Sequence, residues 1–218
     1  MMTIEHVVRC VQTIFGPLRP SDGVSEEEIL TAEHRMKASL PNAIRTLYRQ
    51  LGKHAMHEYG SRMVDIQELE ILDGMLKICV EEQGVTNWAI AGDSHIPDPP
   101  VLSYEIENGR EVYVPEFASF SEFACFLVSW KVAAGALPAV GIRTADDGQN
   151  AEPIANLESV GELMVQTDGA HIRCESGGIV VMQPDGYLLI GAQTKDAFER
   201  IADRMGVLHW EYLSWRDG

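Results

Sequence analysis

The chain has 218 residues, of which 45% are hydrophobic and 23% are charged. This composition is typical of one large or two small globular domains and excludes a disordered chain. Thirty-three acidic residues against seventeen basic ones give a formal net charge of −16. Because an acidic surface is repelled by phosphate backbones and by anionic lipid, we expect neither a nucleic-acid partner nor a membrane partner.

The cysteines and the N-terminal residues indicate the compartment. The four cysteines are widely spaced and include no C-x-x-C pair, so we expect reduced structural thiols, no metal and no other cofactor. The first residues lack a basic region followed by an apolar run, which predicts a cytoplasmic protein without an export signal. The most apolar stretch, residues 123–142, is interrupted by Lys131 and Pro138, which favours a helix that runs into a loop.

The first part of the chain predicts three amphipathic helices. An apolar stripe runs from Ile4 to Phe15. A second helix begins at Ser25, because Ser25 and Glu28 have the spacing of a capping box. A third begins at Pro41, where a first-turn proline costs no hydrogen bond, and carries an apolar stripe as far as its end at Gly52.

After Val64 the hydrophobic period changes from about 3.6 residues to about two, which predicts an antiparallel sheet. The alternating runs are 76–80, 88–90, 102–106 and 112–114. The dipeptide Asn108-Gly109 between the last two runs indicates a hairpin, because both residues tolerate a positive φ. A helix capped by Ser119 follows, and we expect it to pack against the sheet.

The chain then loses its periodicity and becomes rich in Gly, Ala, Pro, Asp and Asn. We therefore predict a first unit at 1–135, a linker or long loop at 136–156, and a second unit at 157–218. The second unit predicts strands near 162–167, 171–174, 178–183 and 187–192, a helix between Thr194 and Gly206, and a last strand within 208–213. Because the strands are grouped, the predicted fold class is α+β.

No pattern of catalytic residues is convincing. The segments around His34 and Ser176 resemble those of chymotrypsin-like proteases, but Cys174 occupies the position where that oxyanion hole needs glycine. His54 and His57 form an H-x-x-H pair in a short segment between glycines, which favours a solvated loop over a metal site. Phosphate-binding glycine motifs are absent from the sequence.

Acidic charge is concentrated in the segment that predicts the sheet. Residues 65–125 contain thirteen acidic and two basic residues, a net of −11, whereas residues 1–64 carry a net of +1. A solvated outer face explains this charge as well as a binding surface does. Repulsion among these carboxylates is better tolerated in a protein that binds a basic partner, because complementary electrostatic fields raise the rate of association.

Two series of motifs lie between residues 40 and 101. The first is Leu40-Pro41-x-x-Ile44-x-x-Leu47-Tyr48-x-x-x-Gly52. The second runs from Leu76-x-Ile78 through Glu81-Glu82-Gln83-Gly84-Val85-x-x-Trp88-x-Ile90 to Asp98-Pro99-Pro100-Val101. Together with the helix from Phe120 to Trp130, these motifs resemble the SUKH superfamily, which includes the SMI/KNR regulators and many bacterial immunity proteins. The resemblance covers about residues 32–131. It departs from the family at Glu82, where asparagine is usual, and it leaves the second unit unexplained.

The resemblance implies a SUKH-like antiparallel sheet with flanking helices and a non-enzymatic protein without catalytic residues. Such a protein neutralises the cognate toxin of a bacterial polymorphic or contact-dependent toxin system, and a basic, nuclease-type toxin fits the acidic sheet. We expect the partner-binding residues to be Glu81, Glu82, Trp88, Asp93, Asp98, Glu105, Glu107 and Glu111. Trp88 occupies an inward-facing position of the alternating pattern, which favours a place in the core. An exposed Trp88 that anchors an interface is the alternative.

Two other functions remain open. The first alternative is a cytoplasmic regulatory scaffold of the SMI/KNR type that binds a cellular protein. The second is a hydrolase that uses His34 and Ser176.

Overall fold

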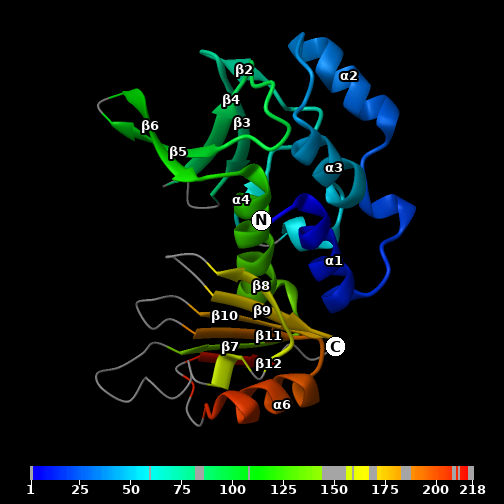
Figure 1. The fold of residues 1–218 in the computed structure, drawn as a ribbon, viewed down its shortest axis with the longest axis vertical. Coiled ribbons are helices and arrows are strands. Elements are labelled where there is room, and N and C mark those ends of the chain that lie inside the picture. The colour runs from blue at the N-terminus through cyan, green and yellow to red at the C-terminus, as the bar shows by residue number, and fades with distance from the viewer. Residues whose placement is uncertain are drawn as a thin grey trace. The chain divides into compact units, whose positions relative to one another are not determined.

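The computed structural model contains two compact units, each built on an antiparallel sheet (Figure 1). Unit 1 consists of Met1–Val8 and Leu18–Ala124, and unit 2 of Arg9–Pro17 and Cys125–Gly218. The structure describes residues 2–58, 60–81, 86–107, 109–143, 156–158, 160–166, 171–182, 188–207, 210 and 212–215. The predicted α+β fold class is confirmed. In the described part of the chain, no helix is both long and apolar enough to cross a membrane.

The helices of unit 1 begin and end close to the predicted positions. They are α1 (Ile4–Phe15), which is divided between the units, α2 (Glu26–Met36) and α3 (Asn42–Leu51), with 3-10 turns at Pro20–Asp22 and Ala55–Glu58. The predicted capping box is present, because Ser25 Oγ accepts from the Glu28 N–H and the Glu28 carboxylate accepts from the Ser25 N–H. Pro41 precedes the first turn of α3 as its N-cap, with an extended backbone, rather than lying inside that turn.

The sheet of unit 1 forms over the predicted alternating runs. Its strands are β1 (Arg62–Met63), β2 (Ile71–Leu72), β3 (Met75–Val80), β4 (Asn87–Ala91), β5 (Val101–Glu107) and β6 (Arg110–Phe117). They are antiparallel in the order β1-β3-β4-β5-β6, with β2 paired to β3. Helix α4 (Phe120–Lys131) follows, and its Phe123 ring lies 5.5 Å from the ring of Trp88, so the start of α4 packs on the sheet as expected.

Unit 2 contains strands near the predicted positions, the additional strand β7, and a helix that packs on the sheet. The strands are β7 (Ala139–Arg143), β8 (Glu162–Gln166), β9 (His171–Glu175), β10 (Gly178–Met182), β11 (Leu188–Ala192) and β12 (Tyr212–Trp215), in the order β12-β7-β11-β10-β9-β8. A π-helical turn, η3 (Val132–Ala136), precedes β7. Helix α6 (Lys195–Met205) begins at the predicted Thr194 cap, whose Oγ1 accepts from the Ala197 N–H, and ends at Gly206 with a φ of 69°.

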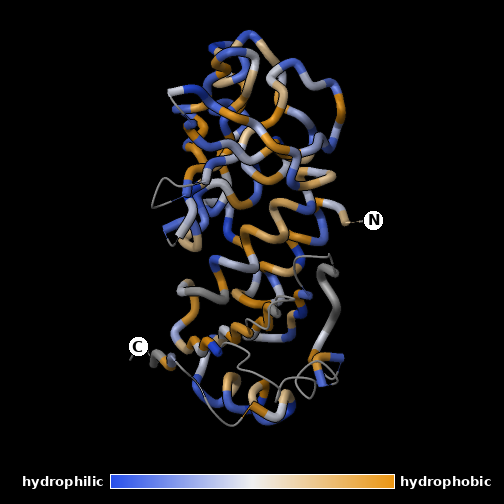
Figure 2. The backbone as a smooth tube through the Cα atoms, turned by 90° about the vertical axis from the view of Figure 1, so that its left-hand side faces the viewer, coloured by the Kyte–Doolittle hydropathy of each residue, from blue (hydrophilic) through white to orange (hydrophobic). Residues whose placement is uncertain are grey.

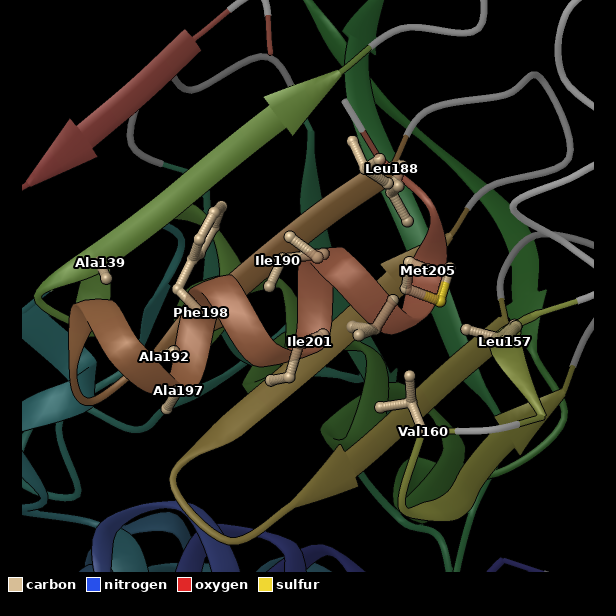
Figure 3. Packing of buried hydrophobic residues seen from close by; sticks show 13 residues of the cluster. Ala139, Leu157, Val160, Leu188, Ile190, Ala192, Ala197, Phe198, Ile201 and Met205 are labelled. Carbon is tan, nitrogen blue, oxygen red and sulfur yellow. The ribbon is translucent and has the colours of Figure 1, made fainter. Parts of the chain in front are cut away.

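One face of the second sheet is covered by α6. Phe198, Ile201 and Met205 of this helix belong to one buried hydrophobic cluster with Leu188 and Ile190 of β11 (Figure 3). Figure 2 shows hydrophobic and hydrophilic residues alternating along much of the chain, as expected for helices and strands that bury one side. The apolar residues that recur with helical or strand periodicity in the sequence are therefore the ones that form the core.

The division into units differs from the predicted one. It falls within α4, between Ala124 and Cys125, and the end of α1 belongs to unit 2. This end of α1 is held there because Thr13 O accepts from the Gly177 N–H and Ile14 O accepts from the Gln193 side-chain amide. A unit boundary inside a helix cannot be recognised in the sequence, because the helical periodicity continues across the boundary.

The predicted linker at 136–156 is wrong for residues 139–143, which form β7 between β11 and β12. Small residues in this strand suggested a loop, but packing explains Gly141. A Cβ atom there would lie 2.5 Å from Phe198 Cζ and 2.7 Å from Trp210 Cε3. Residues 144–155 lie outside the described part of the chain.

We expect Gly141→Val to destabilise the protein by about 1–3 kcal/mol, the usual cost of overpacking a core. The reason is that the new side chain would occupy the space of the Phe198 and Trp210 rings. Urea unfolding followed by circular dichroism measures the change. In a Phe198→Leu background the additional cost should be smaller, and equal costs in the two backgrounds would show that residues 141 and 198 do not compete for space.

Candidate functional site

The hairpin formed by β5 and β6 exposes both acidic and apolar side chains. In its register Ser103 lies opposite Val114, Glu105 opposite Val112, and Glu107 opposite Arg110. Because paired residues share a face and successive residues alternate, these six side chains lie on one face, which we call the hairpin face. Val112 is 39% and Val114 is 54% exposed, and Glu105 and Glu107 are exposed.

The opposite face of the same hairpin carries a polar cluster. Lys77 Nζ lies 2.5 Å from Glu111 Oε1, and the Tyr113 hydroxyl donates to Glu111 Oε2 over 2.5 Å. Lys77 Nζ also lies 5.1 Å from the centre of the Tyr104 ring, which is 5.1 Å from the Tyr113 ring. The ion pair joins β3 to β6 across the two strands between them, so this cluster stabilises the sheet.

The cluster changes the titration of its members. Hydrogen bonds from Lys77 and then from Tyr113 lower the pKa of Glu111 below its usual value of 4.5. The same contact with Glu111 raises the pKa of Lys77. Burial, followed by the hydrogen bond to Glu111, raises the pKa of Tyr113. Lys77 therefore stays charged and is not prepared for nucleophilic chemistry, which needs a lowered pKa.

The structure separates the acidic residues that the sequence grouped together. Glu111 lies on the face opposite Glu105 and Glu107, because its register partner is Ile106. Glu81 Oε2 accepts from the Thr86 N–H over 3.1 Å, and Asp98 Oδ1 accepts from the Ser121 N–H at the start of α4 over 2.9 Å. Of the predicted carboxylates that the structure describes, Glu105 and Glu107 share the exposed hairpin face, while Asp93 is exposed in the turn after β4. The predicted Glu82, Gln83 and Gly84 lie outside the described residues.

Trp88 is a core residue, so its interpretation as an interface anchor is wrong. The side chain is 7% exposed, and its ring packs on Phe123 of α4. Its Nε1 donates to Glu116 Oε2 over 2.9 Å, which satisfies the indole N–H. Pairing with Cys79 and Ser103 places Trp88 on the face of the sheet that α4 covers.

The residues of the first motif build the fold. Leu40 and Leu47 are buried, and the buried Tyr48 donates its hydroxyl proton to Val64 O over 2.5 Å. Burial raises the pKa of Tyr48 well above its usual value, so it stays protonated. Gly52 has no room for a side chain, because a Cβ atom would lie 2.6 Å from Val24 Cγ2 and 2.7 Å from Tyr48 O. Among the remaining motif residues, Pro41 and Pro99 are buried, whereas Pro100 is exposed.

A groove of about 940 Å³ lies elsewhere in unit 1. The α2–α3 connection, the β2–β3 turn and the segment after β4 line it, with Lys37, Leu40, Ile71, Asp93 and His95 among its residues. The groove combines apolar walls with one cation and one carboxylate, and it accounts for one predicted site residue, Asp93. Its size is in the range of small-molecule sites.

The candidate catalytic residues His34 and Ser176 belong to different units. His34 lies in α2 of unit 1, and Ser176 lies in the turn between β9 and β10 of unit 2. His54 Nδ1 lies 3.2 Å from the Met56 N–H nitrogen, and His57 Nε2 lies 2.9 Å from Leu51 O. Among the described residues no group of three His, Cys, Asp or Glu side chains is placed to hold a metal ion. The four cysteines are buried and unbridged.

Comparison of the chain with family models, with curated proteins and with solved structures finds no match. The SUKH resemblance therefore stays a prediction. Sequence reasoning did not identify the exposed valines of the hairpin face or the Lys77 cluster. The register places the valines on the same face as Trp88, because Val114 pairs with Ser103 and Ser103 with Trp88, yet both valines are exposed.

We expect Glu111→Gln to destabilise the protein by about 1 kcal/mol or less at pH 7, the range for a partly exposed charged contact. The native carboxyl has a lowered pKa, so the unfolded chain takes up its proton first as the pH falls below 4.5. The contribution of Glu111 is thus present above this pH and is lost below it. Urea unfolding at a series of pH values measures the difference between wild type and variant.

Glu105→Gln serves as the matched control and should change stability little at any pH, because Glu105 is exposed and forms no ion pair with another described residue. A loss in Glu111→Gln that is the same at pH 3 and pH 7 would contradict the role of the ionised contact.

Proposed function

We propose that the protein is a non-enzymatic immunity protein that binds and neutralises the cognate toxin of a bacterial polymorphic or contact-dependent toxin system. The observation that carries this proposal is the hairpin face, where exposed valines lie beside exposed glutamates. Exposed apolar side chains bordered by charge are typical of protein-binding surfaces. The SUKH-like motif series, which covers about residues 32–131, supports a toxin as the partner.

The distribution of charge supports a basic partner. Residues 65–125 carry a net charge of −11, and this segment contains the hairpin. A nuclease toxin presents a basic surface, because it must bind a phosphate backbone. An acidic protein that covers such a surface blocks access of the nucleic acid, and it needs no catalytic residue. We place this action in the cytoplasm, where a nuclease would meet its substrate.

The decisive experiment is co-expression of the chain with each toxin domain encoded next to its own gene. We expect one of these domains to be toxic alone and harmless together with the chain. The proposal fails if none is toxic or if none is neutralised.

A second function is favoured by one observation in unit 2. Tyr212 and Leu213 of β12, at the end of the strand order, are exposed. Because successive residues of a strand point to opposite faces, β12 exposes one apolar side chain on each face, outside the SUKH-like region. This exposure fits a regulatory scaffold that binds a cellular protein. Gene neighbours that encode no toxin would favour this function.

We expect the double variant Glu105→Lys, Glu107→Lys to slow association with the neutralised toxin about tenfold or more at low salt and to flatten its salt dependence. The reason is that both carboxylates are exposed on the hairpin face. Stopped-flow or surface-binding kinetics at several ionic strengths measure the rates.

The matched control is Glu27→Lys, Glu70→Lys, which changes the net charge equally at exposed positions of unit 1 outside the hairpin. It should slow association much less. Equal slowing by both pairs would assign the effect to net charge and contradict a role of the hairpin face.

A further inference from the structure

Strand β6 is an edge of its sheet. It pairs with β5, and in the part of the chain that the structure describes no strand pairs with its other side (Figure 1). Its eight residues make it the longest strand described in unit 1. A long edge strand presents unpaired N–H and C=O groups that can pair with a strand of another chain.

Strand β6 has few of the features that prevent an edge strand from pairing with another chain. Pro115 lacks an N–H group and lies near the end of β6, which leaves the stretch from Arg110 to Val114 free of proline. Within it Val112 and Val114 are exposed and lie on the same face, two residues apart. An added strand would bring its own alternate side chains beside these two valines.

The charge around the edge selects the partner. Glu105 and Glu107 lie on the face that carries the two valines, and Arg110, the one basic residue of the hairpin, lies opposite Glu107. A segment in which every second residue is either basic or apolar would satisfy both kinds of side chain, because these residues all lie on one face of the added strand. A second copy of this chain would bring the same acidic hairpin, and like charges on neighbouring strands are unfavourable.

We propose that β6 accepts an extended cationic segment of the partner as an additional strand. The apolar side chains of that segment pack on Val112 and Val114, and its cations pair with Glu105 and Glu107. Backbone hydrogen bonds provide affinity, and the hairpin face provides specificity. The proposal rests on the proposed function for the nature of the partner, but it concerns the strand edge itself.

The probe, called the Lys-Val peptide, is acetylated and amidated Lys-Thr-Val-Thr-Val-Thr-Lys-Thr, whose lysines and valines share one face when it is extended. It is mixed with the full chain, and amide hydrogen exchange and chemical shifts, read by NMR, report on β6. We expect saturable binding, shift changes concentrated in β5 and β6, and about tenfold or greater slowing of exchange for edge amides of β6. The Lys-Pro peptide, in which proline replaces each threonine, has the same charge but no N–H at alternate positions, and it should bind at least about tenfold more weakly.

Two variants with the same change in charge test the surface. Val114→Lys should weaken binding of the Lys-Val peptide about tenfold or more, because it places a cation on the hairpin face. Ile106→Lys is the matched control, because Ile106 is 70% exposed but lies on the opposite face of the hairpin, opposite Glu111. It should leave binding within about twofold of wild type. Circular dichroism checks that both variants are folded.

Four outcomes of the peptide experiments would overturn the proposal. They are absence of saturable binding, equal binding of the Lys-Pro peptide, equal weakening by the two lysine variants, and shift changes centred on the groove near Asp93. Protection of β6 without peptide, together with a dimeric mass in sedimentation, would assign the edge to a second copy and would also overturn it. If toxin neutralisation succeeds but the peptide does not bind, strand addition alone fails; if the peptide adds to β6 but no toxin is neutralised, the proposed function alone fails.

Discussion

The register of strands β3 to β6 is the constraint on which the rest of unit 1 depends. Trp88 lies opposite Cys79 and Ser103 and is buried under Phe123, so this face of the sheet is fixed against α4. Every other side chain of β5 and β6 follows from that placement, because a slip of one residue would exchange the two faces. The same register places the two exposed valines beside Glu105 and Glu107 on the face of Trp88, and it places Glu111 with Lys77 on the other face.

Acidic residues in this sheet have two different uses. Several are held by contacts within the fold: Glu81 accepts from a backbone N–H between β3 and β4, Asp98 accepts at the start of α4, and Glu116 accepts from the indole of Trp88. These contacts compensate part of the cost of collecting so much negative charge in one segment. What remains exposed on the hairpin is a smaller group, and its position beside apolar side chains distinguishes it from an ordinary solvated face.

In unit 2 the packing of helix α6 against the sheet depends on a small residue in strand β7. Its helix α6 lies close against the sheet, and Gly141 makes this approach possible because it leaves space for the rings of Phe198 and Trp210. The segment around β7 is therefore poor in large side chains for a structural reason. In the sequence the same residues look like a linker, since small residues are also typical of loops.

The α+β class, the capped starts of α2 and α6, and the longer strands of the first sheet can be predicted from the amino-acid sequence alone, because these depend on local periodicity and on caps within a few residues. The sequence also located the excess of acid in residues 65–125. Only the tertiary structure decided that Trp88 is core, that Glu111 and Glu105 lie on opposite faces, and that residues 139–143 complete a sheet. Each of these depends on which strand lies beside which and on what covers it, and such long-range pairing leaves no periodic trace in one chain.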